Sequence, residues 1–282
     1  MKNKFLFIGF VLVFLISFLG IVSPYLTSYT PSYQDLSHRF AGPSFKHILG
    51  QDEYGADVFT NLVYGARLSL YVSVVTTFFC CLIGLIFGSF AAFFGKWVDQ
   101  LLMRIVDVFL AFPGILLAIG IAALLERSAH NIILALTITG WTSYARLVRG
   151  QILSIREKEF IISARALGFS NARIVAKHVW PNILAPLFIQ ASFGMAGVII
   201  AESSLSFLGV GTGGDLSSWG MMLDQARRHI SDISRIHLLL PPLFAIMMTV
   251  LGFNFLGDGL LQKCDPSRKL PSQFRDDTEK KI

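Results

Sequence analysis

Residues 68–94, LSLYVSVVTTFFCCLIGLIFGSFAAFF, decide the fold class of this chain. The part from Leu70 to Phe94 holds 14 Leu, Ile, Val and Phe residues and no charged residue. A helix of about 20 apolar residues is long enough to cross the hydrocarbon core of a bilayer. Each of these side chains contributes about −0.3 to −0.6 kcal/mol to insertion, so together they favour it by roughly −4 to −8 kcal/mol before polar residues are subtracted. We therefore predict a transmembrane helix.

Five further hydrophobic runs have a comparable length. They lie at residues 5–22, 101–125, 132–148, 184–208 and 236–261. The composition agrees, because 54% of the 282 residues are hydrophobic and 15% are charged, whereas soluble chains carry about 25% charge. The sequence therefore predicts an all-α, polytopic membrane protein with about six transmembrane helices. The run at 132–148 is the least apolar, and its polar residues predict a helix that faces other helices or water instead of lipid.

The first run has some features of a signal peptide, because Lys2 and Lys4 precede it. However, it is about 18 residues long, which is the threshold for spanning a bilayer. It also ends in Ser23-Pro24-Tyr25, without a small-x-small cleavage site. These features favour an uncleaved first span.

The basic residues predict the orientation. Most of the 24 Lys and Arg residues fall on one side of the membrane if the N-terminus is cytoplasmic, so the positive-inside rule predicts that both termini are cytoplasmic. The predicted organisation is an N-terminal cytoplasmic end with the first span at 1–26, an extracytoplasmic loop at 27–67, a membrane core at 68–261 and a cytoplasmic tail at 262–282. Residues 210–235 are expected to form a second extracytoplasmic segment, and the charged tail is predicted to be disordered.

Several chemical functions are disfavoured by the sequence. It has no phosphate-binding loop, since Gly95-Lys96 is followed by Trp97 instead of Ser or Thr. We therefore expect no ATP hydrolysis by this chain and no cofactor of its own. The acidic stretch at 49–57 lacks EF-hand spacing, which favours a solvated loop over a metal site. The six His residues fall in loops or at the ends of spans, which disfavours an intramembrane hydrolase.

Charged residues within the predicted spans are candidates for function. Asp107 lies three residues after Arg104, and a local ion pair is favoured over a proton relay, with Asp107 kept as a candidate for gating or translocation. Glu202 is an intramembrane acid. Two interpretations of it stay open, namely a gating or translocation residue and a structural glutamate satisfied by hydrogen bonds.

Small residues and prolines in the spans predict packing and helix breaks. The small residues recur at steps of three and four, which places them on one helical face and predicts close helix packing. They are Gly84, Gly88, Ala91, Ala92 and Gly95. Pro113, Pro241 and Pro242 are expected to kink or delimit helices.

The segment 146–182 carries seven Lys or Arg residues against two acidic residues. Good helix formers follow Glu159 and stop at Gly168, a residue typical of the left-handed position after a helix. Ser170 is suited to cap a second helix, and Pro181 is expected to break the chain before the next span. The pattern predicts a basic helix–turn–helix hairpin. Two interpretations stay open, namely a helix that docks in a partner's groove and a basic loop that lies on anionic headgroups.

Residues 159–186, EFIISARALGFSNARIVAKHVWPNILAP, resemble the cytoplasmic "EAA" loop of type I ABC importer permeases. More narrowly, they resemble the second permease of dipeptide, oligopeptide and nickel importers. Six other segments are similar to this family in the same order, at 50–57, 64–70, 107–113, 144–151, 201–209 and 253–260. The chain departs from the family pattern at Ile162-Ser163, where a Glu–Ala pair is usual, at Ala56, where arginine is usual, and at 211–215, where a proline-rich stretch is usual.

The resemblance implies a type I ABC importer permease fold, with a coupling loop at 149–183 that docks on a separate ATPase. The residues it assigns to coupling are Glu159, Ser163, Ala164, Ala166, Leu167, Gly168 and Pro181. The implied partners are a second, related permease, two ABC ATPase subunits that bind ATP, and an extracytoplasmic solute-binding protein at the bacterial cytoplasmic (inner) membrane. The implied activity is import of dipeptides or oligopeptides by alternating access, without catalysis by this chain.

Two other transport functions are carried as alternatives. Nickel import is the alternative within the family. An ion-coupled secondary transporter is the alternative outside it, and such transporters are typically built from internal repeats with broken helices at the membrane midplane. The sequence has no convincing repeat, which favours the ATP-driven importer.

Overall fold

The computed structural model describes residues 4–31, 33–213, 217–229 and 231–264. Within these ranges the regular structure is helical, and the one bridge of strand type joins Gln51 and Asp57. The predicted all-α class is therefore confirmed. The predicted disordered tail lies outside the described residues from 265 onward, as do 214–216 of the second loop segment.

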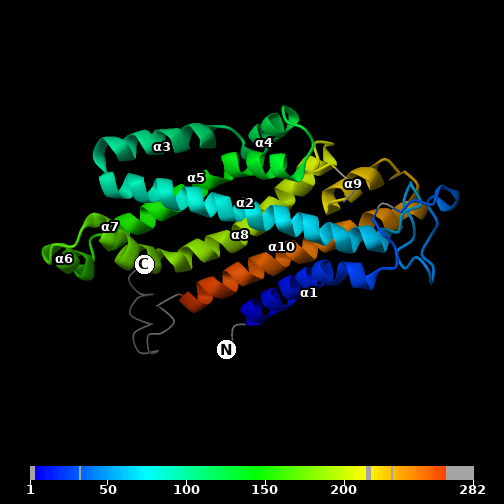
Figure 1. Cartoon of the computed structure of the whole chain (residues 1–282), viewed down its shortest axis with the longest axis horizontal. Helices are drawn as coiled ribbons and strands as arrows, with labels where there is room; N and C mark the ends of the chain where they lie inside the picture. The colour runs from blue at the N-terminus through cyan, green and yellow to red at the C-terminus, as the bar shows by residue number, and fades with distance from the viewer. Residues whose placement is uncertain (1–3, 32, 214–216, 230, 265–282) are drawn as a thin grey trace, which may run out of the picture.

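Five long helices run along one elongated bundle (Figure 1). They are α1 (Lys4–Leu26), α2 (Val58–Phe94), α5 (Ala129–Ile155), α8 (Trp180–Phe207) and α10 (Ile236–Cys264). The shorter helices are α3 (Lys96–Ala111), α4 (Gly114–Ala123), α6 (Glu159–Ala166), α7 (Asn171–Ile174) and α9 (Trp219–Arg227), with 3-10 turns at Leu36–His38 and Ile233–Arg235 and a π-helical turn at Val175–Val179.

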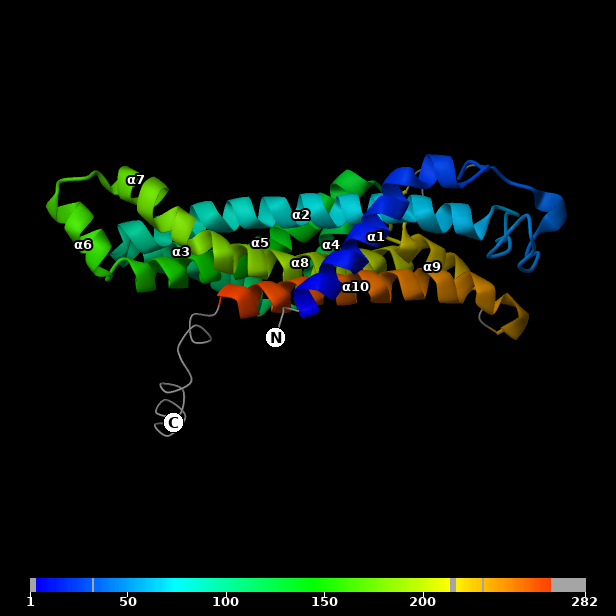
Figure 2. The ribbon, with the colours of Figure 1, turned by 90° about the horizontal axis from the view of Figure 1, so that it is seen from below.

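The two ends of the bundle differ. At one end α6 and α7 project beyond the other helices, and we call this the hairpin end (Figure 1). At the other end lie α9 and the irregular segment between α1 and α2, and we call this the loop end. The same bundle seen from below has α1 crossing it obliquely (Figure 2).

Four helical runs among the described residues are long and apolar enough to cross a membrane: α1, α2, residues 175–207 and α10. A fifth candidate is the pair α3 and α4, which are bent by 83° to one another. The predicted third span is therefore broken, and the break falls where Pro113 was expected to delimit a helix. Phe112 is extended there (φ −95°, ψ 140°) because a following proline disfavours the helical backbone.

The predicted fourth span falls within α5. This helix has 27 residues, but it is not among the helices that are apolar enough to qualify. Its polar residues account for this, as the sequence indicated. The total of six spans and the cytoplasmic placement of both termini therefore stay predictions.

Helix α2 begins earlier than predicted. The Oδ2 atom of Asp57 accepts hydrogen bonds from the Thr60 N–H at 2.8 Å and the Thr60 hydroxyl at 2.7 Å, which caps the helix at Val58. Residues 58–67, predicted as loop, are therefore helical. With 37 residues, α2 is about 56 Å long at 1.5 Å per residue, well beyond the roughly 30 Å of a hydrocarbon core.

Glycines allow α2 and α5 to pack closely. A Cβ atom on Gly84 would lie 2.3 Å from the Cβ of Tyr144, and one on Gly88 would lie 2.6 Å from the main-chain oxygen of Ala145. The predicted packing face is confirmed at these two positions. Gly95 differs, because no neighbour lies within 4 Å of its Cβ position and its φ is +57°, so it ends α2 and does not pack.

The crossing of α1 and α10 also depends on small residues. A Cβ atom on Gly9 would lie 2.5 Å from the main-chain N of Leu256, and one on Gly259 would lie 2.5 Å from the Cα of Leu6. Close approach of this kind is how helices associate in a membrane, where lipid offers no hydrophobic driving force between them.

Candidate functional site

The hairpin at residues 156–179 has the predicted helix–turn–helix form. After α6, the N–H of Gly168 donates to the oxygen of Arg165 at 3.0 Å and the N–H of Phe169 donates to the oxygen of Ala164 at 3.2 Å. These two bonds, with φ +78° at Gly168, form a Schellman motif. The left-handed glycine expected from the sequence is therefore confirmed. Nothing lies within 4 Å of its Cβ position, so this point of the turn is open, whereas the next residue, Phe169, packs against the core of the hairpin.

The predicted coupling residues divide into two groups. Ala164 is 5% exposed and packs in a core cluster with Ile161 and Ile174, so its small side chain holds the hairpin together. The others are exposed on the surface of the hairpin end. They are Glu159, Ser163, Ala166, Leu167, Gly168 and Pro181.

Helix α6 also exposes two apolar side chains that were not among the predicted coupling residues, Phe160 at 41% and Ile162 at 56%. The predicted Leu167, which caps the end of α6, is 75% exposed. Large apolar side chains at a projecting tip point to an interaction surface. Ile162 stands in one of the positions where the chain departs from the family pattern that it resembles, so the departure adds apolar surface to this helix.

The second half of the hairpin joins α8 without the break predicted at Pro181. Ser170 caps α7, since its hydroxyl accepts from the Arg173 N–H at 3.4 Å. A π-helical turn follows, in which the Trp180 N–H donates to the oxygen of Val175. Proline is tolerated in the first turn of a helix because the N–H it lacks is not needed there, and Pro181 stands at that position of α8.

A side-chain contact fixes the start of α8 against α2. The indole Nε1 of Trp180 donates to the hydroxyl of Ser89 at 3.2 Å. The hairpin is thus attached to two long helices, α5 before it and α8 after it, with α8 held to α2. A displacement of the hairpin would reach the bundle through these contacts.

Two arginines of α5 bind aspartates of α3. Arg149 forms two hydrogen bonds with the carboxylate of Asp99, the Nη2–Oδ2 distance being 2.6 Å. Arg146 Nη2 lies 2.6 Å from Asp107 Oδ1. The predicted local pair of Arg104 and Asp107 is therefore wrong, because the carboxylate of Asp107 is engaged by a residue of the neighbouring helix.

Glu202 is enclosed by four hydroxyls, which we call the serine cage. The Ser206 hydroxyl donates to Oε1 at 2.8 Å and the Ser203 hydroxyl lies 3.5 Å from Oε2. The hydroxyls of Ser218 and Ser69 also hydrogen-bond to the carboxyl group. Glu202 is 0% exposed. The cage joins α8 to α2 and to the residue that precedes α9, and it matches the structural interpretation of Glu202.

The acidic stretch at the loop end forms a tight turn. Asp52 Oδ1 accepts the N–H groups of Tyr54 at 2.8 Å and Ala56 at 2.9 Å. Burial raises the pKa of Asp52, although these two N–H groups lower it. The stretch is therefore more ordered than a solvated loop, and the carboxylates of Asp52 and Asp57 accept hydrogen bonds from backbone N–H groups. Among the described residues no group of three or more His, Cys, Asp and Glu side chains could hold a metal ion.

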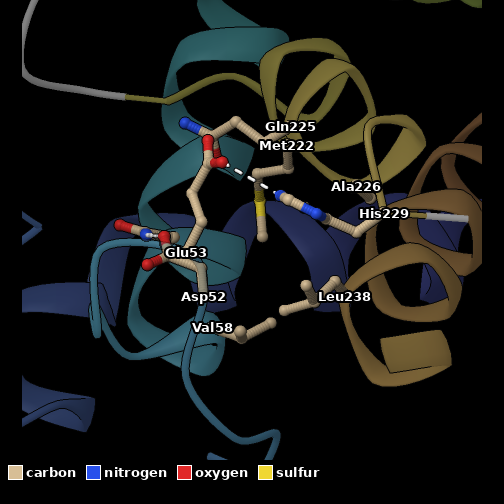
Figure 3. Close-up of a pocket in the computed structure, with 9 residues that line it drawn as sticks. Asp52, Glu53, Val58, Met222, Gln225, Ala226, His229 and Leu238 are labelled. Carbon is tan, nitrogen blue, oxygen red and sulfur yellow. Dashed lines mark hydrogen bonds and ion pairs between the residues drawn. The ribbon is translucent and has the colours of Figure 1, made fainter. Parts of the chain in front are cut away.

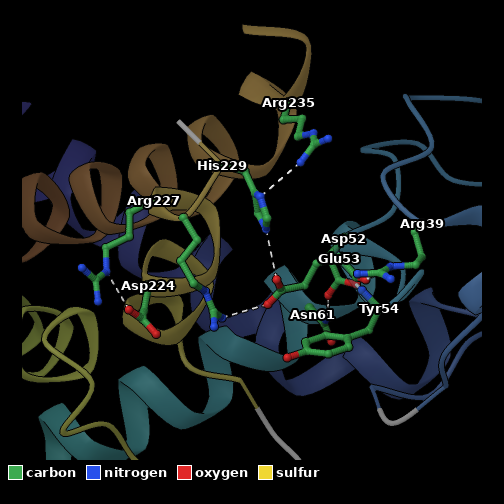
Figure 4. A network of polar contacts seen from close by, with 10 residues as sticks. Arg39, Asp52, Glu53, Tyr54, Asn61, Asp224, Arg227, His229 and Arg235 are labelled. Atoms are coloured by element: carbon green, nitrogen blue, oxygen red, sulfur yellow. Dashed lines mark hydrogen bonds and ion pairs between the residues drawn. The ribbon is translucent and has the colours of Figure 1, made fainter. Parts of the chain in front are cut away.

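Glu53 ties this turn to the segment after α9 (Figure 4). Its Oε1 accepts from Arg228 Nη2 at 2.8 Å, and its Oε2 lies 3.0 Å from His229 Nε2. Arg39 donates to its main-chain oxygen at 2.6 Å. Arg235 Nη1 approaches His229 Nδ1 at 3.1 Å. Because an arginine can only donate, the proton of this imidazole resides on Nε2 and points to Glu53.

A small cavity lies beside this network (Figure 3). Its volume is about 20 Å³, and Asp52, Asn61, Gln225 and His229 contribute polar groups to its wall. A space of that size holds about one water molecule. It does not offer room for a cargo molecule.

Comparisons with known proteins give a consistent family. The family described as "Binding-protein-dependent transport system inner membrane component" matches residues 84–270, and "N-terminal TM domain of oligopeptide transport permease C" matches residues 1–43. The chain is 41% identical over 268 residues to the dipeptide transport system permease protein DppC of Alkalihalophilus pseudofirmus, covering 95% of this chain and 88% of that one.

Two more relatives carry related names. The oligopeptide transport system permease protein OppC of Bacillus subtilis is 34% identical over 265 residues, covering 94% of this chain and 86% of that one. The glutathione transport system permease protein GsiD of Shigella dysenteriae is 38% identical over 258 residues, covering 91% and 84%. Among solved structures, a chain of the MetNI methionine ABC transporter in an inward-facing conformation has a TM-score of 0.59 at 22% identity, covering 72% of this chain and 95% of that one. That likeness concerns the fold.

Proposed function

Because this chain belongs to the family of inner-membrane components of binding-protein-dependent transport systems, we propose that it is the permease subunit of an ATP-driven peptide importer. Its homologues and its apolar helices make it a multi-pass protein of the bacterial inner membrane. As a member of this family it works with other components of an ABC importer.

The observation that carries the proposal is the free tip of the hairpin. Leu167 is 75% exposed, Gly168 has open space around it, and α6 is short enough to enter a groove as a unit. Apolar residues framed by basic ones suit a cleft on another protein better than open water. We assign this tip to contact with a separate ATPase subunit and place the hairpin end in the cytoplasm.

The remaining partners follow from this assignment. A second, related permease would complete the path, two ATPase subunits would bind ATP, and a solute-binding protein would deliver cargo at the loop end. This chain would then need no cofactor and perform no chemistry. Closure of the ATPases would draw the two hairpins together and open the path outward, which is alternating access.

Peptides are the cargo class that the relatives support. Those named above are permeases of dipeptide, oligopeptide and glutathione systems. Nickel ions are the alternative within the family, and transport driven by an ion gradient is the alternative outside it.

The test is reconstitution of the complex captured through an affinity tag on this chain. We expect an ABC ATPase and a second permease to co-purify. In lipid vesicles supplied with the solute-binding protein, a mixture of di- to hexapeptides should accumulate with ATP and remain outside without it, as read by mass spectrometry. Uptake that stops with an uncoupler and does not depend on ATP would identify the chain as a secondary transporter. Accumulation of Ni²⁺ in place of peptides would assign the nickel importer.

A further inference from the structure

A polar stripe runs along one face of α5. Thr139, Ser143, Arg146 and Gly150 follow one another at steps of four, three and four residues, so they share a face of the helix. Thr139 is half-buried and the other three are exposed. Hydroxyls and a charged pair facing hydrocarbon would be costly. This face of α5 is therefore turned toward water or protein.

A matching stripe of small and polar residues runs along α8. Gln190, Gly194, Gly197 and Ala201 have the same spacing of four, three and four residues. Gly197 is exposed, and no atom lies within 4 Å of its Cβ position. Apart from Gln190, the side chains along this face are short or absent, which leaves room beside the helix.

The two stripes border a single hollow. Its volume is about 220 Å³, and Thr139 and Ser143 of α5 line it together with Gln190 and Gly197 of α8. Thr77 of α2 also contributes to its lining. We call this surface the polar groove.

One glycine of the groove has a specific steric role. A Cβ atom on Gly194 would lie 1.8 Å from the hydroxyl of Tyr144, so only glycine lets this hydroxyl reach the lining of the hollow. None of the residues that line the hollow is charged. The Arg146–Asp107 ion pair stands about one turn further toward the hairpin end, where it bounds the groove.

Resting on the importer function proposed above, we propose that the polar groove is the wall along which peptide cargo passes, between this chain and its partner permease. Its hydroxyl and amide groups suit the one feature common to all peptides, the polar main chain. Because the wall carries no charge, it would accept cargo side chains of either sign. Selection among peptides would then lie elsewhere in the complex.

The structure supplies matched control positions. Leu134 precedes Ser143 by nine residues, and Phe188 precedes Gly197 by nine, which is about two and a half helical turns and places each pair on opposite faces. Leu134 is 50% exposed and Phe188 is 60% exposed. Ser143 and Gly197 are exposed as well. Any difference in reactivity within a pair therefore reports the surroundings of each face in the complex and not exposure in the single chain.

The experiment uses the full complex in lipid vesicles. In the parent all three cysteines, Cys80, Cys81 and Cys264, are replaced by serine, because Cys80 lines the hollow itself and would react with the reagent. Ser143→Cys and Gly197→Cys are treated with a charged, membrane-impermeant methanethiosulfonate reagent, beside Leu134→Cys and Phe188→Cys. We expect the groove thiols to react about tenfold faster or more, since only hydrated thiols ionise. Reaction at the groove should abolish ATP-driven uptake of the peptide mixture, and reaction at the controls should leave it intact.

The outcomes separate this inference from the function on which it rests. A parent complex without ATP-driven peptide uptake counts against the importer function. A parent that imports peptides while the groove thiols react no faster than the controls overturns the groove assignment. Fast reaction that leaves uptake intact overturns it as well.

A steric block gives an independent measurement. Gly197→Trp should stop uptake while the protein still inserts and assembles, because its Cβ position is open. Gly120→Trp on α4 is the control, since its Cβ position is equally open and lies outside the groove. Equal uptake by the two variants would contradict the proposal.

Discussion

At the scale of single residues, Glu202 is the clearest case of a group whose role depends on distant partners. A glutamate in an apolar run is visible in the sequence, and it invites a functional interpretation. Its cage is not visible, because Ser69 belongs to the distant helix α2 and Ser218 to the segment beyond the end of α8. The local neighbours Ser203 and Ser206 are consistent with either interpretation.

Replacement of Glu202 separates the two interpretations. We expect Glu202→Ala to lower the stability of the purified protein by about 3 kcal/mol, because it leaves a cavity and unpaired hydroxyls. Glu202→Gln keeps the shape and most hydrogen bonds, so its thermal midpoint should fall less and its uptake should persist. The measurement is thermal unfolding in detergent beside reconstituted uptake. A Glu202→Gln protein that is stable but inactive would assign a gating role.

The Asp107–Arg146 contact gives a second prediction at this scale. Both side chains are about half exposed, so the pair should contribute less than about 1 kcal/mol to stability. Arg146→Asp places two acids together at the edge of the polar groove, and we expect it to reduce uptake. The double variant Asp107→Arg with Arg146→Asp should recover part of it. Arg104→Ala is the control and should have little effect on uptake. An equal loss of uptake in that variant would support the Arg104–Asp107 pair that the sequence spacing suggested.

At the scale of elements, the sequence predicted the hairpin well and the ends of the spans poorly. The hairpin depends on local signals, namely Gly168 as the helix stop and Ser170 as the cap, so it could be predicted. The early start of α2 depends on Asp57, which serves as an N-cap only once the acidic turn before it has formed. The π-helical turn before Pro181 could not be predicted, because a proline at this position is equally consistent with an ordinary helix break.

Substitution of Gly168 tests the hairpin as an element. At φ +78° with open space around it, a β-branched side chain meets backbone strain of about 1–2 kcal/mol but no steric clash with neighbours. We expect Gly168→Val to insert and assemble, yet to hydrolyse ATP without importing peptide. Gly168→Asn should retain import, because Asn tolerates the left-handed conformation. The readout is the ratio of ATP hydrolysed to peptide imported, and a normal ratio for Gly168→Val would count against docking.

At the scale of the whole molecule, glycines decide how the helices cross. The recurrence of Gly84 and Gly88 predicted a packing face, and the partner helix proved to be α5. The crossing of α1 and α10 was not predicted, since Gly9 and Gly259 lie at opposite ends of the chain and carry no shared pattern. Fold class and family could be inferred from the sequence, whereas pairing between helices needed the structure.

The α1–α10 crossing yields a prediction for the assembled bundle. Gly9→Leu would force a Cβ within 2.5 Å of main-chain atoms of α10, so α1 must move away. We expect a lower thermal midpoint and faster proteolysis between α1 and α2. Gly120→Leu, with open space at its Cβ position, should behave as the unchanged protein. A Gly9→Leu protein as stable as this control would show that α1 is not held at the crossing.

Helix α2 reaches from the acidic turn before Val58 to the neighbourhood of the hairpin, where Ser89 accepts from Trp180. It has no proline within it, so it can act as a lever about 56 Å long. A tilt of about 5° around its centre would displace each tip by roughly 2 Å in opposite directions. In the importer proposed above, nucleotide binding by the ATPases at the hairpin end would thereby shift the loop end, where the solute-binding protein docks, without any helix having to unwind.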